Sequence, residues 1–102
     1  MRCDVAAIGD LPGGEGVQVE AGGEPVLLVR VGDHVYATSG LCSHEERPLL
    51  GGTRIGDTEW QCPHHGGALD LATGRPTRMP VCAPVATYPV EVRDGRVWVT
   101  VD

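Results

Sequence analysis

The chain has no phenylalanine, lysine or asparagine, and aromatic residues make up only 4% of its 102 residues. With so few large rings, valine must supply much of the buried surface, and valine favours strands. The chain has no stretch of about 18 apolar residues that would span a membrane, and its N-terminus lacks the apolar run of a signal peptide. We therefore expect a small, strand-rich protein of the cytoplasm that does not enter a membrane.

Positive charge is also scarce. Eight arginines stand against 14 acidic residues, which gives a formal net charge of −6. Nucleic-acid binding needs a basic surface that neutralises phosphates, so this charge argues against nucleic acid as a partner. The length is that of one domain near the lower end of the usual size range, in which a metal centre would help to stabilise a small core.

Two Cys-His pairs lie within the 24 residues from Cys42 to His65. The first is a C-x-H at 42–44, and the second begins at Cys62 and offers either His64 or His65. A Cys and a His this close in sequence reach one centre only from a tight turn, so each pair predicts a loop tip. Together two such tips supply two sulfurs and two imidazole nitrogens, the ligand set of a Rieske [2Fe–2S] centre.

Zinc is the alternative metal, because it also binds sites with two Cys and two His ligands. Zinc fingers usually group Cys with Cys and His with His, whereas this chain mixes the two types within each pair. The other two cysteines, Cys3 and Cys82, lie outside the motif, and we expect them to be free thiols. Turn-forming residues flank both pairs, which argues against a chance occurrence; they are Gly40, Pro63, Gly66 and Gly67.

On these residues the chain resembles the Rieske ferredoxins that carry electrons to aromatic-ring-hydroxylating dioxygenases. The resemblance covers nearly the whole chain. It rests on the C-x-H at 42–44, the C-P-x-H-G at 62–66, the run at 69–74, and the shorter matches at 80–81 and 87–90.

The resemblance implies which residues hold the cluster. The family motif puts the second imidazole ligand at the later histidine, which leaves His64 as a solvent-facing loop residue. One [2Fe–2S] cluster per chain is thus expected on four ligands, namely Cys42, His44, Cys62 and His65.

Departures from the high-potential relatives of the cytochrome bc type are also informative. Those proteins have an additional Cys after each motif, and the two form a disulfide; here Glu45 and His64 hold those positions. Gly67 stands where those proteins have a Ser that hydrogen-bonds a cluster sulfide. With fewer such bonds, the reduction potential is expected at the low end of the Rieske range.

Alternating apolar and polar residues predict antiparallel strands, and the resemblance implies an all-β, Rieske-type fold. The composition shifts to Gly, Pro, His and charge over residues 40–80, which we take as a cluster-binding subdomain inserted into a scaffold of residues 1–39 and 81–102. Asp94-Gly95 predicts a hairpin that closes the scaffold sheet. Strands are predicted at 2–7, 17–20, 25–31, 34–38, 53–55, 59–61, 68–71, 87–93 and 96–102.

A one-electron centre on a small chain with no visible substrate pocket indicates an electron carrier, not an enzyme. Trp60 and Trp98 are expected in the core and not as electron relays. The resemblance implies electron transfer from a flavin-dependent reductase to a terminal oxygenase, through small and transient contacts. Two alternatives stay open. One is the small Rieske-like subunit of an assimilatory nitrite reductase, which often lacks the ligands, and the other is a zinc-stabilised interaction module.

Overall fold

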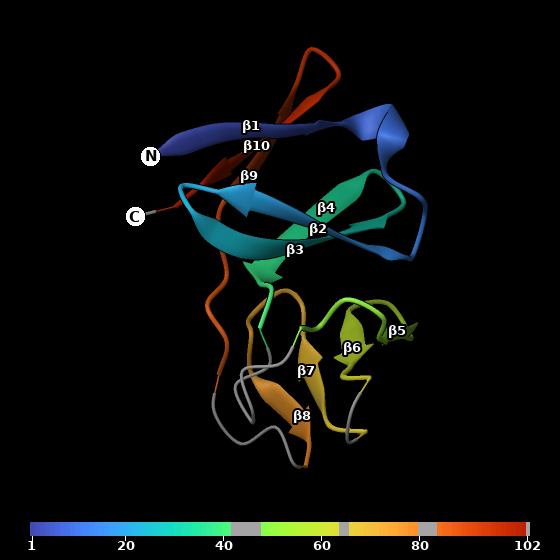
Figure 1. The fold of residues 1–102 in the computed structure, drawn as a ribbon. Helices are drawn as coiled ribbons and strands as arrows, with labels where there is room; N and C mark the ends of the chain where they lie inside the picture. The colour runs from blue at the N-terminus through green and yellow to red at the C-terminus, as the bar shows by residue number, and fades with distance from the viewer. Residues whose placement is uncertain (42–47, 64–65, 80–83, 102) are drawn as a thin grey trace.

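The computed structural model describes residues 1–41, 48–63, 66–79 and 84–101. Three small antiparallel sheets follow one another along the molecule, as Figure 1 shows from top to bottom. The described residues contain strands and one short 3₁₀ turn, so the predicted all-β class is confirmed. In this part of the chain no helix has the length and apolar character that crossing a membrane requires.

The central sheet is a meander of β2 (Gly16–Ala21), β3 (Glu24–Val31) and β4 (His34–Ser39). The middle strand β3 holds four consecutive side chains with 0% exposure, from Val26 to Val29. Neighbouring side chains of a strand point to opposite faces, so this run means that both faces of the sheet are covered. Leu27 and Val29 contribute to one core, while Val26 and Leu28 contribute to the other.

The terminal sheet is made by the two ends of the chain, in the order β1-β10-β9. Its strands are β1 (Arg2–Ala7), β9 (Val90–Arg93) and β10 (Arg96–Thr100), and the 3₁₀ turn η1 (Ile8–Asp10) follows β1. Asp94 and Gly95 join β9 to β10 with φ angles of 52° and 77°, the conformation that an Asp-Gly hairpin turn adopts.

Two expectations about the C-terminal hairpin are wrong. It does not close a single scaffold sheet, because it pairs with β1 in a sheet of its own. The first strand of this hairpin, β9, starts at Val90 and not at residue 87, because Pro89 has no N–H to donate to the hydrogen bonds of a sheet. Val92 is 44% exposed despite its place in the apolar alternation, because β9 is the edge strand of the sheet.

The four-stranded sheet lies at the other end of the molecule, at the bottom of Figure 1. Its strands follow chain order and have three residues each: β5 (Thr53–Ile55), β6 (Glu59–Gln61), β7 (Ala68–Asp70) and β8 (Pro76–Arg78). The sequence predicted the first three. It did not indicate β8, whose proline and two exposed polar residues carry no apolar alternation.

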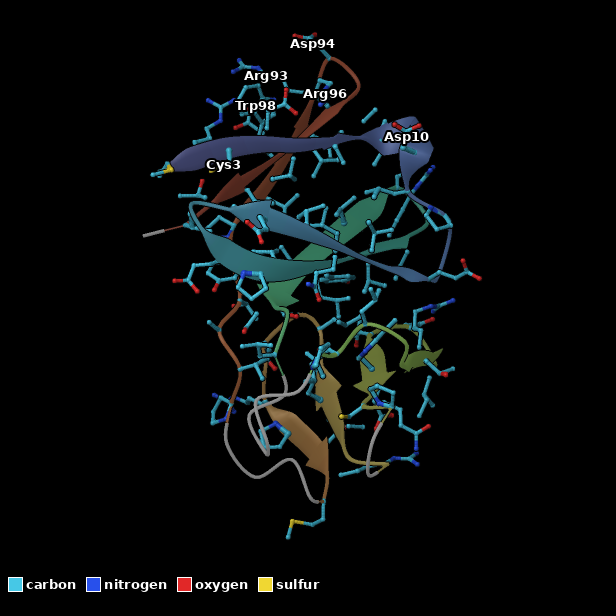
Figure 2. All side chains as sticks on the ribbon, viewed as in Figure 1. Cys3, Asp10, Arg93, Asp94, Arg96 and Trp98 are labelled. Carbon is cyan, nitrogen blue, oxygen red and sulfur yellow. The ribbon has the colours of Figure 1, made fainter. Side chains whose placement is uncertain are left out.

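The two tryptophans have different environments. Trp60 is 1% exposed in the core beside the four-stranded sheet, as predicted. Trp98 is only partly buried, because it lies on the outer face of the terminal sheet, where the Arg2 guanidinium stacks 4.7 Å from its ring. Figure 2 shows Trp98 with Arg93 and Arg96 at the end of the molecule opposite the four-stranded sheet.

Ion pairs cover that outer face. Arg96 Nη2 lies 2.8 Å from Oδ1 of Asp4, and this hydrogen-bonded carboxylate raises the pKa of the Arg96 guanidinium. Arg2 lies 3.6 Å from Glu91, which also faces Arg93 at 3.6 Å. Charges of both signs are thus matched across the three strands of the terminal sheet.

Candidate metal centre

Of the four predicted ligands, Cys62 lies within the described residues. Cys42, His44 and His65 lie outside them, as do His64, Cys82 and the matched residues 80–81. Among the described residues no three His, Cys, Asp or Glu side chains gather at one point. The site is therefore described through Cys62 and through the residues that flank the segments 42–47, 64–65 and 80–83.

Cys62 directly follows β6, so its position is fixed by the pairing of that strand with β5 and β7. Its side chain is 4% exposed and belongs to the same core as Trp60 and Leu69. Its backbone N–H donates to the carbonyl oxygen of Gly67 at 2.6 Å. The two ends of the second Cys-His segment are therefore held together, as a loop tip requires.

The ends of the first Cys-His segment are also tied. Leu41 and Pro48 form an antiparallel bridge, and the Leu49 N–H donates to the Gly40 carbonyl oxygen at 2.8 Å. Gly40 in turn donates to the carbonyl oxygen of Pro25 at 2.9 Å, next to the start of β3. The chain thus enters and leaves the segment 42–47 from one point on the central sheet.

A close contact joins the flanks of the two segments. The indole N–H of Trp60 donates to the Leu49 carbonyl oxygen at 3.0 Å inside the core. Gly52 lies so close to β6 that a Cβ atom there would come 2.2 Å from the Gln61 carbonyl oxygen. The sequence analysis did not predict this contact between the two flanks. The position of Trp60, two residues before the predicted ligand Cys62, could have indicated it. The Gly52 N–H also donates to the Leu49 carbonyl oxygen at 3.1 Å, but it is the close approach to Gln61 that requires a glycine here.

The flank of the third undescribed segment is fixed in the same way. Gly74 accepts a 2.9 Å hydrogen bond from the Val85 N–H, and a Cβ at Gly74 would lie 2.2 Å from the Val85 carbonyl oxygen. On the other side, Arg78 and Thr77 of β8 bond to the Glu59 carboxylate at 3.1 and 2.8 Å. β8 is thereby linked across β7 to β6, the strand that Cys62 directly follows.

Apolar side chains surround the framework on the surface. Met79 is 79% exposed and Leu50 is 44% exposed, and the neighbouring prolines Pro48 and Pro63 are exposed as well. Each of these residues stands at or near the end of an undescribed segment. A contiguous exposed apolar patch is typical of a surface that contacts another protein, and these residues are candidates for one.

The surroundings of Cys62 fit a sulfur-ligated iron centre. Its thiol is buried among apolar side chains, and an apolar shell limits the access of solvent to a cluster. The donor set implied by the sequence, two thiolates and two imidazoles, matches a Rieske cluster. Zinc is compatible with the same four donors, so the framework alone does not choose between the two metals.

Comparison with known proteins makes that choice. The profile of the Rieske [2Fe-2S] domain matches residues 1–89. A curated relative, ferredoxin CarAc of Metapseudomonas resinovorans, is 42% identical over 78 residues, which cover 76% of this chain and 72% of that protein.

Solved structures agree with the fold. The ferredoxin of carbazole 1,9a-dioxygenase from Nocardioides aromaticivorans IC177 has a TM-score of 0.94 and 38% identity, covering 98% of this chain and 97% of that one. A ferredoxin-containing complex, of reduced oxygenase and oxidized ferredoxin in carbazole 1,9a-dioxygenase, gives a TM-score of 0.89 and 36% identity, with coverages of 97% and 92%. A putative NADH-dependent nitrite reductase small subunit from Mycobacterium tuberculosis is more distant, with a TM-score of 0.85, 25% identity and coverages of 97% and 93%.

Proposed function

Because the chain belongs to the Rieske [2Fe–2S] domain family, we propose that four of its residues hold the cluster, namely Cys42, His44, Cys62 and His65. The observation that supports this most is the position of Cys62, which is buried directly after β6. The hydrogen bond from Cys62 to Gly67 and the bridge from Leu41 to Pro48 support two loop tips. When bound, the cluster supplies reversible one-electron chemistry.

The chain is an electron carrier and not an enzyme, in line with relatives that are ferredoxin components. We propose that it takes single electrons from a flavin-dependent reductase and passes them to an aromatic-ring-hydroxylating terminal oxygenase. The complex of a related ferredoxin with its oxygenase supports the second partner. We also propose that the protein acts in the cytoplasm.

We propose that partners dock on the end of the molecule that carries the four-stranded sheet. Residues 40–80 then form the cluster-binding subdomain, and residues 1–39 with 81–102 form the scaffold. The exposed side chains of Leu50, Pro63 and Met79 supply apolar contact at this end. Contacts of less than about 1,200 Å² in total suit a carrier that must leave each partner quickly.

The two alternatives have less support. The nitrite reductase small subunit shares the fold, but at 25% identity it is a more distant neighbour than the 38% identical ferredoxin. A zinc module is at odds with a family whose domain carries a [2Fe–2S] cluster. A red-brown holoprotein that contains iron and sulfide, and no zinc, is therefore expected.

A pair of adjacent variants tests the ligand assignment. His65→Ala is expected to lose the visible absorption of the histidine-ligated cluster, because one iron loses a ligand. His64→Ala differs by one position and is expected to keep that absorption. The reverse result would transfer the ligand role to His64, and loss in both variants would leave the motif assignment without support.

Electron transfer is tested with purified partners. The reduced protein is mixed with an oxidised Rieske-type terminal oxygenase in a stopped-flow instrument, and reoxidation is followed in the visible spectrum. In this assay Met79→Glu is expected to slow electron transfer, because it puts a charge on the proposed apolar contact surface. Val92→Glu, at the opposite end of the molecule, should have no effect on the rate. Equal slowing by both variants would contradict docking at the four-stranded sheet.

A further inference from the structure

One edge of the strand β9 is not covered by any other strand of the described residues. β9 is the last strand in the sheet order β1-β10-β9, and it pairs with β10. Along it, the exposed fractions are 51% for the Glu91 side chain, 44% for Val92 and 63% for the Arg93 side chain. The turn at Asp94 that follows lies at the outermost end of the terminal sheet, at the top of Figure 2. This edge is therefore accessible to another chain.

The register of the β9–β10 hairpin shows which backbone groups point to the open edge. A two-residue turn joins the strands, so Arg93 and Arg96 form the first hydrogen-bonded pair of the ladder. The Thr100 N–H donates to the Pro89 carbonyl oxygen at 3.0 Å, which fits the same alternation further along. Alternate residues of an antiparallel strand bond to the same neighbour, so the N–H and C=O groups of Val92 point away from β10.

Two opposite charges flank the centre of this edge. An open edge can bind a further strand, and proteins usually prevent this with charged side chains. Glu91 and Arg93 stand on either side of Val92, so they share one face of the sheet. Such a pair is poorly matched to most strands but is complementary to itself, because an antiparallel copy of the strand presents the same two charges in reverse order.

These charges select one register for two copies of β9. With Val92 opposite Val92 of the second copy, each Glu91 faces an Arg93 of the other copy, and both pairs are attractive. A centre shifted by one residue puts Glu91 opposite Glu91, or Arg93 opposite Arg93, and like charges directly opposite are destabilising. The attractive register is also the one in which the two Val92 residues exchange both hydrogen bonds of a ladder pair, because their backbone groups point across the edge.

We propose that β9 pairs antiparallel with β9 of a second copy of this chain, about a two-fold axis at Val92. The homodimer joins the terminal sheets of both copies into one sheet and covers the exposed Val92 side chains. Figure 2 places Arg93 at the end of the molecule opposite the four-stranded sheet, so the cluster-binding ends of both copies stay free. Monomer and dimer therefore present the same surface to redox partners, and the inference does not depend on the proposed ligands.

Sedimentation velocity on the cluster-loaded protein measures self-association. A contact between two short strands is small and therefore weak, so a shift from monomer to dimer is expected as the concentration rises to about 1 mM. Glu91→Arg turns both attractive pairs into repulsive ones and should weaken dimerisation about tenfold, and Arg93→Glu should do the same. The double variant Glu91→Arg/Arg93→Glu restores opposite charges in each pair, so it should dimerise within about threefold of the unmodified protein.

Glu20→Arg is the matched control for the charge change. Glu20 is exposed on β2, an edge strand of the central sheet, and the control should dimerise at least as well as the unmodified protein, because it lowers the net negative charge. Val92→Pro tests the backbone contact. Proline removes the N–H that crosses the proposed interface and is tolerated on an edge strand, so this variant should stay monomeric. Circular dichroism and the visible spectrum verify that each variant is folded.

Hydrogen exchange locates the contact in the unmodified protein. The Val92 amide should exchange more slowly at high protein concentration, while the Glu91 amide, which points to β10 within one molecule, should not change. The proposal is overturned if the protein stays monomeric throughout the concentration range. It is also overturned if Glu91→Arg leaves the dimer unchanged, if the double variant does not restore it, or if folded Val92→Pro still dimerises, because the copies then meet at another surface.

Discussion

The backbone N–H of Cys62 donates to the carbonyl oxygen of Gly67 at 2.6 Å, and this bond ties a proposed ligand to the residue that distinguishes the chain from high-potential relatives. Both residues are buried. A side chain at residue 67 would therefore start from a backbone position that is fixed relative to Cys62. A substitution at Gly67 is therefore expected to change the surroundings of the cluster directly.

The first prediction concerns the reduction potential. The protein is expected near the lower limit of the Rieske range, about −150 mV, since Gly67 has no hydroxyl to donate to a cluster sulfide. Gly67→Ser should raise the potential, because such a bond stabilises the more negative reduced cluster. Protein-film voltammetry measures both, and Gly67→Ala, which adds bulk but no donor, should leave the potential nearly unchanged. A potential well above zero in the unmodified protein would refute the explanation.

The second prediction separates close packing from backbone strain. Gly74 and Gly23 have similar φ angles, 76° and 82°, but a Cβ at Gly74 would lie 2.2 Å from a carbonyl oxygen, while Gly23 has open space. Gly23→Ala should cost about 1–2 kcal/mol for the left-handed conformation alone. Gly74→Ala should cost about 2–5 kcal/mol, because overpacking adds to the strain. Urea unfolding followed by circular dichroism compares them; equal midpoints would contradict the packing argument.

The third prediction concerns the joint between the two Cys-His flanks. Trp60→Phe removes the donor to the buried Leu49 carbonyl oxygen and should lower the free energy of unfolding by about 1–3 kcal/mol. Trp98→Phe, at a partly exposed site where the main contact is the Arg2 guanidinium, should cost about 0.5 kcal/mol. Denaturant unfolding measures both values. If Trp98→Phe costs as much as Trp60→Phe, the buried hydrogen bond is not what fixes the joint.

Much of the fold is predictable because local signals act within a few residues. The Asp94-Gly95 turn and the valine alternation around it indicated the last hairpin, and the apolar run at 25–31 indicated the central strand. Pairing between distant segments has no such signal. Residues 1–7 contain no local pattern that indicates pairing with the C-terminal hairpin. The sequence analysis therefore did not predict that the scaffold forms two separate sheets, β1-β10-β9 and β2-β3-β4.

Side-chain environments were harder to predict than strands. Trp60 and Trp98 look alike in sequence, but β6 is covered by the central sheet while the outer face of β10 meets solvent. The edge strand β8 was missed because it is held by the Glu59 carboxylate from two strands away and not by apolar burial. For the site, the motif supplied four candidate ligands, of which Cys62 is the one that the described structure places.

The last prediction concerns removal of the cluster. The four-stranded sheet has strands of three residues, and its core includes the Cys62 side chain, so it depends on what Cys62 binds. The scaffold has a second core of its own, with Val97 and Val99 fully buried between its two sheets. Chelating the iron should therefore speed amide exchange in β5 to β8 and leave β3 and β10 protected, because local regions unfold separately when their contacts are separate. Hydrogen exchange with mass spectrometry, on the holoprotein and the chelated protein, makes the comparison. Uniform loss of protection would mean that the two cores unfold as one unit.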